Sequence, residues 1–180
     1  MALTSKAPGL SAAPQEQGPQ NVEPSTEHTI GVISDTHSLL RPEAVDYLQG
    51  SEIIVHAGDI GSPDVLEVLS EIAPVYAVRG NNDRGDWAQA VPEVEMFEFS
   101  GKTIYMVHDP ADIDIDPHAA GVDLIVTGHT HHPKLEERDG VIYLNPGSAG
   151  PRRFKLPIAI GKVTLKDGEL SAELDTLSIG

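Results

Sequence analysis

The chain has no cysteine among its 180 residues. Disulfide bonds, zinc–thiolate sites and a cysteine nucleophile are therefore excluded, and any bound metal must take nitrogen and oxygen ligands. Aromatic residues are also scarce, at 4% of the chain, so a core must be built from Val, Ile, Leu and Ala. A core of this kind is typical of strands that are covered by helices on both faces.

Basic residues are few: 12 Lys and Arg stand against 28 Asp and Glu, and the net charge is −16. Proteins that bind extended nucleic acid normally present a basic face to the phosphates. We therefore expect neither extended nucleic acid nor an anionic membrane as a partner. A small phosphorylated molecule is compatible with this charge if metal cations supply a local positive field.

Long apolar runs are missing as well, and none approaches the roughly 20 residues that a membrane helix needs. Residues 1–28 are rich in Pro, Gln, Ser, Ala and Gly, and they contain neither the apolar stretch of a secretory signal nor the arginines of a transit peptide. We therefore predict a disordered tail over 1–28, one domain over 29–180 and a cytoplasmic location.

From residue 29 onward, strand-like and helix-like segments alternate. The pattern predicts strands over 29–34, 52–57 and 75–79, with one helix beginning near Pro42 and another over 62–71. The second half of the chain is predicted to be mainly β, with a polar loop over 80–91, a short helix over 116–121, and strands over 94–99, 102–107, 123–127, 134–138, 141–144, 158–165 and 169–177. This order favours a mixed sheet, or two stacked sheets, with helices outside.

Seven polar side chains stand where the apolar, strand-like runs end. In an open α/β sheet the carboxyl ends of the strands line one crevice, so these side chains are expected to meet there. Carboxylate, amide and imidazole groups are all metal ligands. The seven candidates, which would act through bound metal and water, are Asp35, His37, Asp59, Asn81, His108, His129 and His131.

The number of these ligands favours two metals. If the two oxygens of Asp59 bridge the metals, each metal receives four protein ligands. Metals about 3.5–4 Å apart can hold a hydroxide between them and clamp a transferring phosphoryl group. No side-chain nucleophile is then needed, which fits a chain without cysteine or a nucleophile-elbow serine.

The ordered motifs resemble those of the calcineurin-like metallophosphoesterase superfamily, and within it the small bacterial and archaeal phosphodiesterase branch. The motifs are 35–37 (DTH), 57–59 (AGD), 80–83 (GNND), the lone His108 and 128–131 (GHTH). The resemblance covers residues 29–180. It implies an α/β fold, a four-layer α/β/β/α sandwich of two mixed β-sheets flanked by helices, and a loop at 145–148 near the site.

The resemblance also implies a ligand set for each of two divalent transition-metal ions. The first ion would be bound by Asp35, His37, Asp59 and His131, and the second by Asp59, Asn81, His108 and His129. Manganese is expected first, with nickel, iron and zinc as alternatives. The implied reaction is hydrolysis of a small phosphodiester, and a homo-oligomer stays open.

The chain departs from the superfamily pattern at two positions. Many members carry a histidine that protonates the leaving group, and this chain has Asn82 there. The branch usually has a second histidine shortly after the His108 position, and this chain has Asp109 and Pro110 instead. We therefore expect weak turnover of esters with poor leaving groups.

Two other functions remain open on sequence alone. One is a phosphomonoesterase or nucleotide phosphatase that uses the same site, and the other is a non-catalytic, protein-binding scaffold of the same fold. Outside the seven ligands, His56 is expected to be a buried histidine that supports the site, and residues 112–116 a solvated acidic loop. Arg152 and Arg153 could hold a substrate phosphate or an oligomer partner, and a surface salt bridge is the favoured interpretation.

Overall fold

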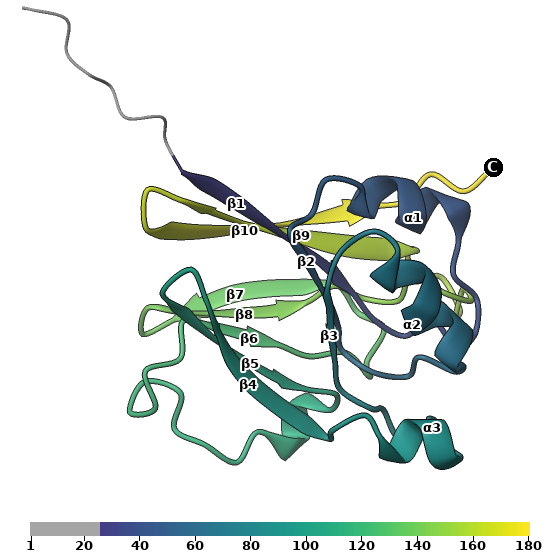
Figure 1. Cartoon of the computed structure of the whole chain (residues 1–180), viewed down its shortest axis with the longest axis horizontal. Coiled ribbons are helices and arrows are strands. Elements are labelled where there is room, and N and C mark those ends of the chain that lie inside the picture. Colours follow the sequence, from purple (N-terminus) through teal and green to yellow (C-terminus); the bar gives the residue numbers. More distant parts are fainter. Residues whose placement is uncertain (1–25) are drawn as a thin grey trace, which may run out of the picture.

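A computed structural model describes residues 26–180 and shows two five-stranded sheets stacked face to face (Figure 1). The strand order is β10-β9-β1-β2-β3 in the first sheet and β4-β5-β6-β8-β7 in the second. Both sheets are mixed, since β1 runs parallel to β2 and antiparallel to β9, while β5 runs parallel to β6 and antiparallel to β4. The predicted α/β fold with two mixed sheets is confirmed.

Both ends of the described chain contribute to the first sheet. Its strands are β1 (Glu27–Ile33), β2 (Ile53–His56), β3 (Val75–Ala77), β9 (Ala159–Lys166) and β10 (Glu169–Thr176). The second sheet comes from the middle of the chain, as β4 (Val94–Phe99), β5 (Lys102–Val107), β6 (Leu124–Val126), β7 (Lys134–Arg138) and β8 (Val141–Asn145). The order of the elements therefore follows the sequence prediction closely.

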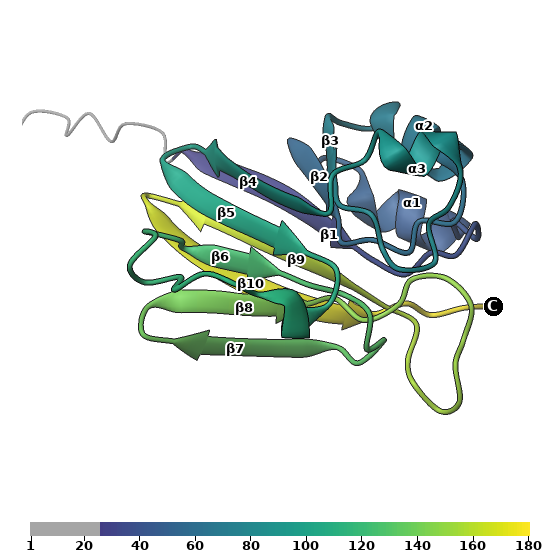
Figure 2. The same ribbon diagram turned by 90° about the horizontal axis from the view of Figure 1, so that it is seen from below.

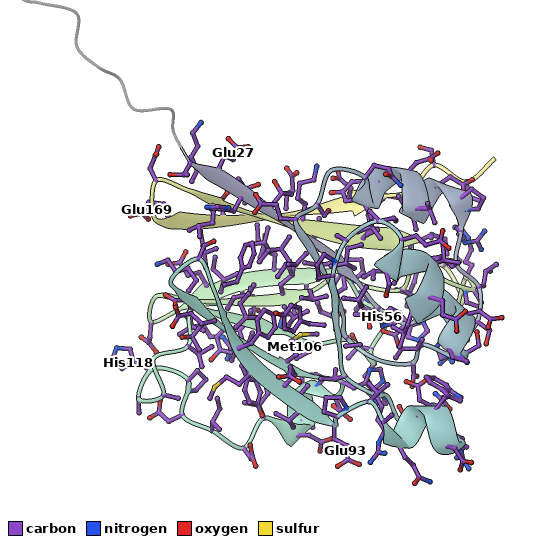
Figure 3. All side chains as sticks on the ribbon, viewed as in Figure 1. Glu27, His56, Glu93, Met106, His118 and Glu169 are labelled. Carbon is purple, nitrogen blue, oxygen red and sulfur yellow. The ribbon has the colours of Figure 1, made fainter. Side chains whose placement is uncertain are left out.

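The main core lies between the two sheets. Val32 and Val55 of the first sheet face Met106, Val126 and Leu144 of the second, and all five are buried. Figure 3 shows Met106 in the space between the sheets. Burying a side chain of this kind contributes about 1.5–3 kcal/mol, so this layer holds the two halves of the site together.

Helices α1 (Pro42–Leu48) and α2 (Pro63–Ser70) pack against the outer face of the first sheet (Figure 1). Each begins with a proline, whose missing N–H is not needed in the first turn. Leu48 and Leu69 are fully buried in the core that these helices form with the sheet. Among residues 26–180, no helix combines the length and apolar character that crossing a membrane demands.

The outer face of the second sheet is covered by an irregular segment instead of helices. Residues 108–122 contain only a one-turn 3-10 helix, Pro110–Asp112, and their Ile113 and Ile115 pack against the sheet. The helix predicted over 116–121 is wrong, because these residues form turns. Six residues close too few hydrogen bonds to offset helix nucleation.

Two other details differ from the sequence prediction. Strand β1 begins at Glu27, two residues early, because His28 pairs with Leu165 of β9. The predicted tail otherwise lies outside the described residues. The polar loop predicted over 80–91 contains one short helix, α3 (Asp86–Gln89).

Candidate metal centre

All seven predicted side chains come together at one end of the two sheets. They follow β1, β2, β3, β5 and β6, so each lies on a loop at the carboxyl end of a strand. Potential ligand atoms of Asp35, His37 and His131 lie within 4.8 Å of one another, as do those of Asp35, Asp59 and His108. The sheet thus joins groups that are far apart in the sequence, as the strand-end argument predicts.

The first group surrounds a small space with two imidazoles and two carboxylates. Nε2 of His131 lies 3.1 Å from Oδ1 of Asp35 and 3.3 Å from Nε2 of His37. Nε2 of His37 lies 3.9 Å from Oδ1 of Asp35 and 3.7 Å from Oδ2 of Asp59. Ligands about 2.0–2.2 Å from one ion lie roughly 3–4 Å apart, so this spacing fits a bound cation.

The second group adjoins the first through Asp59. Oδ2 of Asp59 lies 3.5 Å from Nε2 of His108, and Oδ1 of Asn81 lies 3.1 Å from Nδ1 of His129. The same Asp59 oxygen is 3.7 Å from His37. One carboxylate therefore reaches both groups, which is the arrangement that a bridging ligand requires.

Buried polar atoms without partners test whether this cluster suits a metal. Within residues 26–180, Oδ1 of Asp35, Nε2 of His108 and Nδ1 of His131 are buried and make no hydrogen bond. Such atoms are normally paired in folded proteins. The Asp35 and His108 atoms face the cluster, where a cation would satisfy both, so the donor set fits a divalent metal.

The ring of His108 is held in the orientation that a ligand needs. Its Nδ1 lies 2.7 Å from the carbonyl oxygen of Ala57, so Nδ1 carries the proton and donates it there. Nε2 is then left with a lone pair directed at Asp59. Gly58 permits this approach, since a Cβ at that position would lie 2.6 Å from Nδ1 of His108. The altered residues after His108 therefore leave its position intact.

Asp109, the departure from the family pattern, lies beside the second group. Its Oδ2 is 3.4 Å from Nε2 of His129, and its Oδ1 accepts the backbone N–H of Ala111 at 2.9 Å. Nδ1 of His129 faces Asn81, so the carboxylate lies at the far side of the ring. A carboxylate in this place orients a histidine ligand and makes it more basic.

Several of the seven residues adopt unusual backbone conformations. The φ angles of Asp35, His37, Asp59, His129 and His131 lie between 45° and 67°. This left-handed region is uncommon for residues other than glycine, and such outliers cluster at functional sites. The neighbouring glycines were visible in the sequence, but the strain on the ligands themselves was not.

Asp83 is an important residue that sequence reasoning missed. Its buried carboxylate accepts the backbone N–H groups of Ile60 at 3.2 Å, Gly61 at 2.8 Å and Gly80 at 2.8 Å. It thereby ties the loop that carries Asp59 to the loop that carries Asn81. The only sequence signal is an aspartate at the end of the GNND motif, in a turn where a carboxylate often accepts backbone N–H groups.

Asn82 supports Asp59 directly. Its Nδ2 donates to Oδ2 of Asp59 at 2.7 Å, and its backbone N–H donates to Oδ1 at 2.9 Å. Burial by itself would raise the pKa of Asp59, but the adjacent His108 side chain and the two hydrogen bonds from Asn82 outweigh burial and hold the pKa below its usual range. Asp59 is therefore a carboxylate at neutral pH, ready to bind cations.

His56 is buried behind the ligand loops, as predicted (Figure 3). The hydroxyl of Thr36 donates to the carbonyl of Ile60 at 2.9 Å and so accepts from Nε2 of His56, also at 2.9 Å. Nδ1 of His56 accepts the N–H of Gly58 at 3.2 Å. Burial lowers the pKa of His56 to about 4. The ring is thus a neutral, fully bonded brace between two loops.

We expect His56 to make the fold sensitive to acid. Because its pKa is about 4 in the folded protein and 6.5 ordinarily, the unfolded chain takes up the proton first as the pH falls. The contribution of His56 to the free energy of unfolding is therefore complete above pH 6.5 and is lost as the pH falls toward 4. A difference of this size corresponds to about 3 kcal/mol of unfolding free energy.

Urea unfolding of the metal-free protein, over a series of pH values, measures this effect. His56→Gln keeps a donor for Thr36 but does not titrate, so its unfolding free energy should depend less on pH. An identical pH slope in both proteins would show that His56 is not the acid-sensitive group.

The remaining predicted features lie away from the cluster. Asp114 and Asp116 belong to the irregular cover of the second sheet, where Asp116 accepts the N–H of Ala119 at 3.1 Å. His118 is exposed at the end of the molecule opposite His56 (Figure 3). The salt bridge predicted for Arg152 and Arg153 is not found, since no ion pair among residues 26–180 involves either one.

A pocket of about 320 Å³ opens beside the second group of ligands. Asn81, His108 and His129 form part of its wall. Asp109 and Asp112 line the same pocket, and so do Arg79 and Glu93, which form an ion pair with each other and leave the two aspartates as the unbalanced charge. A reacting group bound at the cluster would therefore have an acidic wall on this side.

Known proteins resemble the chain in both sequence and fold. The family model of the calcineurin-like phosphoesterase superfamily domain matches residues 29–168. A probable metallophosphoesterase of Methanothermobacter thermautotrophicus is 38% identical over 158 residues, which cover 81% of this chain and 90% of the relative.

Two solved structures show the same fold. One is an archaeal phosphodiesterase, with a TM-score of 0.66, 24% identity, and coverage of 82% of this chain and 99% of that one. The other is Vps29 of Entamoeba histolytica in complex with zinc, with a TM-score of 0.62, 23% identity, and coverage of 82% and 98%.

Proposed function

The chain belongs to the calcineurin-like phosphoesterase superfamily, and from this premise we propose that it is a two-metal phosphodiesterase. The observation that carries the proposal is the position of Asp59, whose Oδ2 lies 3.7 Å from the His37 nitrogen and 3.5 Å from the His108 nitrogen. A shared carboxylate of this kind is what a pair of ions needs. The phosphodiesterase fold neighbour supports the choice of reaction.

The residues divide between the two ions as the resemblance implies. Asp35, His37, Asp59 and His131 would hold the first ion, and Asp59, Asn81, His108 and His129 the second. When bound, two divalent ions lower the pKa of water between them and stabilise negative charge on the phosphoryl group. Nitrogen and oxygen ligands suit manganese, nickel, iron and zinc, and manganese is our first choice.

The chain's own groups fix the geometry of this centre. Oδ2 of Asp35 accepts the Ser34 hydroxyl at 2.6 Å and the backbone N–H of His129 at 3.1 Å, so its Oδ1 is left to face His131. Asn82 holds both oxygens of Asp59. Ligands held by such contacts need little reorganisation on binding, which favours tight metal binding.

The acidic pocket wall favours a diester over a monoester. Asp109 and Asp112 lie beside the second ligand group, where a second negative charge on the substrate would be repelled. A phosphomonoester near neutral pH carries more negative charge than a diester. We therefore rank phosphodiesters above the phosphomonoesterase alternative.

Metal analysis and a simple assay test the proposal. Protein loaded with manganese should retain close to two ions per chain and hydrolyse bis(p-nitrophenyl) phosphate faster than p-nitrophenyl phosphate. EDTA should abolish the activity. Protein that neither holds stoichiometric metal nor hydrolyses either ester would instead support the scaffold alternative.

We expect the rate to depend strongly on the leaving group. Asn82 is bonded to Asp59 and is not an acid, so no side chain at this position protonates the departing oxygen. A general acid contributes about 10²–10⁴-fold to a rate. Diesters with alkyl leaving groups should therefore react at least about 100-fold more slowly than nitrophenyl diesters.

A series of methyl aryl phosphates whose leaving phenols increase in pKa measures this dependence. The logarithm of kcat/KM should fall steeply along the series. A nearly flat plot would mean that another group protonates the leaving oxygen, and our assignment of Asn82 would be wrong.

A further inference from the structure

A short basic and aromatic loop projects from the end of the molecule that holds the ligand cluster. We name residues 151–155 the PRRFK loop after its sequence, and Figure 2 shows it extending beyond the carboxyl ends of β5 and β6. It contains three of the 12 basic residues, Arg152, Arg153 and Lys155, in a chain whose net charge is −16. All five residues are exposed, and Phe154 is 94% exposed. A concentration of positive charge and apolar surface is unusual for this protein.

The base of the PRRFK loop is fixed to the first ligand group. The hydroxyl of Ser148 donates to the carbonyl of Asp35 at 2.8 Å. Gly150 packs so closely on the same turn that a Cβ there would lie 2.3 Å from the Thr36 oxygen. On the other side of the loop, the N–H of Ala159 donates to the carbonyl of Ser148 at 2.9 Å. The loop therefore leaves a rigid base directly beside Asp35 and His37.

The charges around the cluster are unevenly distributed. None of the ion pairs within the described part of the chain uses a basic residue of the PRRFK loop. The loop that carries these basic residues starts directly from the turn of Asp35 and Thr36, through the contacts of Ser148 and Gly150. Asp109 and Asp112 lie on the opposite side, beside His129. Positive charge is thus concentrated in the loop that leaves from the first ligand group, and negative charge lies beside the second.

Phe154 combines exposure with an unfavourable backbone conformation. Its φ angle is 52°, in the left-handed region that a bulky residue rarely adopts. Neither packing nor backbone preference explains a phenylalanine here. An exposed aromatic ring beside cationic groups is the usual platform for stacking a base or another flat ring next to a phosphate.

We propose that the PRRFK loop binds the non-leaving arm of the substrate, with an aromatic ring stacked on Phe154 and phosphate oxygens facing Arg153. This inference rests on the proposed function and names its substrate class: a small phosphodiester with one aromatic, nucleoside-like arm. The leaving arm then points toward Asp109 and Asp112, which favour a neutral or cationic group. The overall negative charge limits the ligand to a short one.

Two diesters with the same leaving group test this assignment. Thymidine 5′-(p-nitrophenyl phosphate) and methyl p-nitrophenyl phosphate differ only in the arm that stays on phosphorus. Phe154→Ala should raise KM for the thymidine ester about tenfold and leave the methyl ester unchanged, as expected when one stacked base is lost. Phe154→Trp should restore the wild-type KM for the thymidine ester. Arg153→Ala should raise KM for both esters, and Arg153→Lys should restore part of the loss.

Two further variants separate recognition from folding and from general charge effects. Phe154→Gly removes the ring and also suits a φ angle of 52°, so its melting temperature should not fall below that of wild type. It should nevertheless show the same tenfold loss on the thymidine ester. Arg138→Ala, on β7, removes an exposed positive charge outside the loop and is the matched control for Arg153→Ala. It should leave KM for both esters unchanged.

The outcomes distinguish this inference from the proposed function. If wild type hydrolyses both esters but Phe154→Ala affects them equally or not at all, the loop assignment is wrong and the phosphodiesterase stands. If wild type hydrolyses neither ester, the proposed function fails, and calorimetric titration of the manganese-loaded protein still decides the loop. Phe154→Ala should then weaken binding of thymidine 5′-monophosphate about tenfold without affecting inorganic phosphate. Equal affinities for both proteins would overturn the inference.

Discussion

Replacing Asp59 by alanine is expected to reduce kcat/KM for bis(p-nitrophenyl) phosphate at least about 10³-fold, or about 4 kcal/mol of transition-state stabilisation. Its carboxylate reaches both halves of the cluster, at 3.7 Å from His37 and 3.5 Å from His108. Without it, two ions would lose their shared anionic ligand and repel one another more strongly. Steady-state kinetics and metal content, measured on the same preparations, test this expectation.

Asp59→Asn separates the charge from the shape of the side chain. It keeps an oxygen and most of the packing, so the protein should fold, yet it should bind fewer than two ions and lose most of its activity. Glu169→Ala is the matched control, because Glu169 is an exposed acid at the opposite end of the molecule (Figure 3). Full activity of Asp59→Ala with manganese would refute the two-metal proposal.

Replacing Asp83 by alanine is expected to lower the free energy of unfolding by about 3–5 kcal/mol. The substitution leaves three backbone N–H groups without their acceptor, those of Ile60, Gly61 and Gly80. Each unpaired buried donor costs about 1–3 kcal/mol, and solvent entering the gap would recover part of this. Metal affinity should fall as well, because Asp83 joins the loops of Asp59 and Asn81.

Urea unfolding in EDTA measures the stability of Asp83→Ala without a contribution from metal binding. Asp83→Asn should lose less stability, since its amide oxygen can still accept hydrogen bonds from backbone N–H groups. Asp86→Ala removes a nearby exposed aspartate at the start of α3 and should change stability by less than about 0.5 kcal/mol. If Asp83→Ala and Asp86→Ala unfold alike, the three hydrogen bonds do not stabilise the loops as we infer.

The positions of the seven candidate ligands were predictable because they depend on topology. Parallel strands of one sheet align their carboxyl ends, so polar residues after β1 and β2 share one sheet edge and those after β5 and β6 share another. The stacking of the two sheets then brings the two edges together. His108 illustrates the strength of this rule, since its place after β5 holds even though the next residue, Asp109, departs from the family pattern. Strand patterns are local in sequence, and the meeting of their ends follows from them.

The features that sequence reasoning missed depend on contacts between loops. Asp83 acts on backbone groups more than 20 positions away, and no periodicity reveals such partners. The pairing of Arg152 or Arg153 also depends on which side chains lie nearby, and both residues are exposed in a loop. Residues 116–121 are too short to form a stable helix by themselves, so their conformation depends on packing against the sheet. The sequence of so short a segment does not reveal that packing.

The position of β1 in the first sheet has a consequence for the order of assembly. This strand lies between β2 and β9, and its residues 27–32 pair with residues 161–166. A chain emerging from the ribosome therefore carries Asp35 long before the strand that completes its support has been made. Contacts of such high sequence separation form late and slowly. The metal centre can therefore reach its final geometry only after β9 has been synthesised and paired with β1.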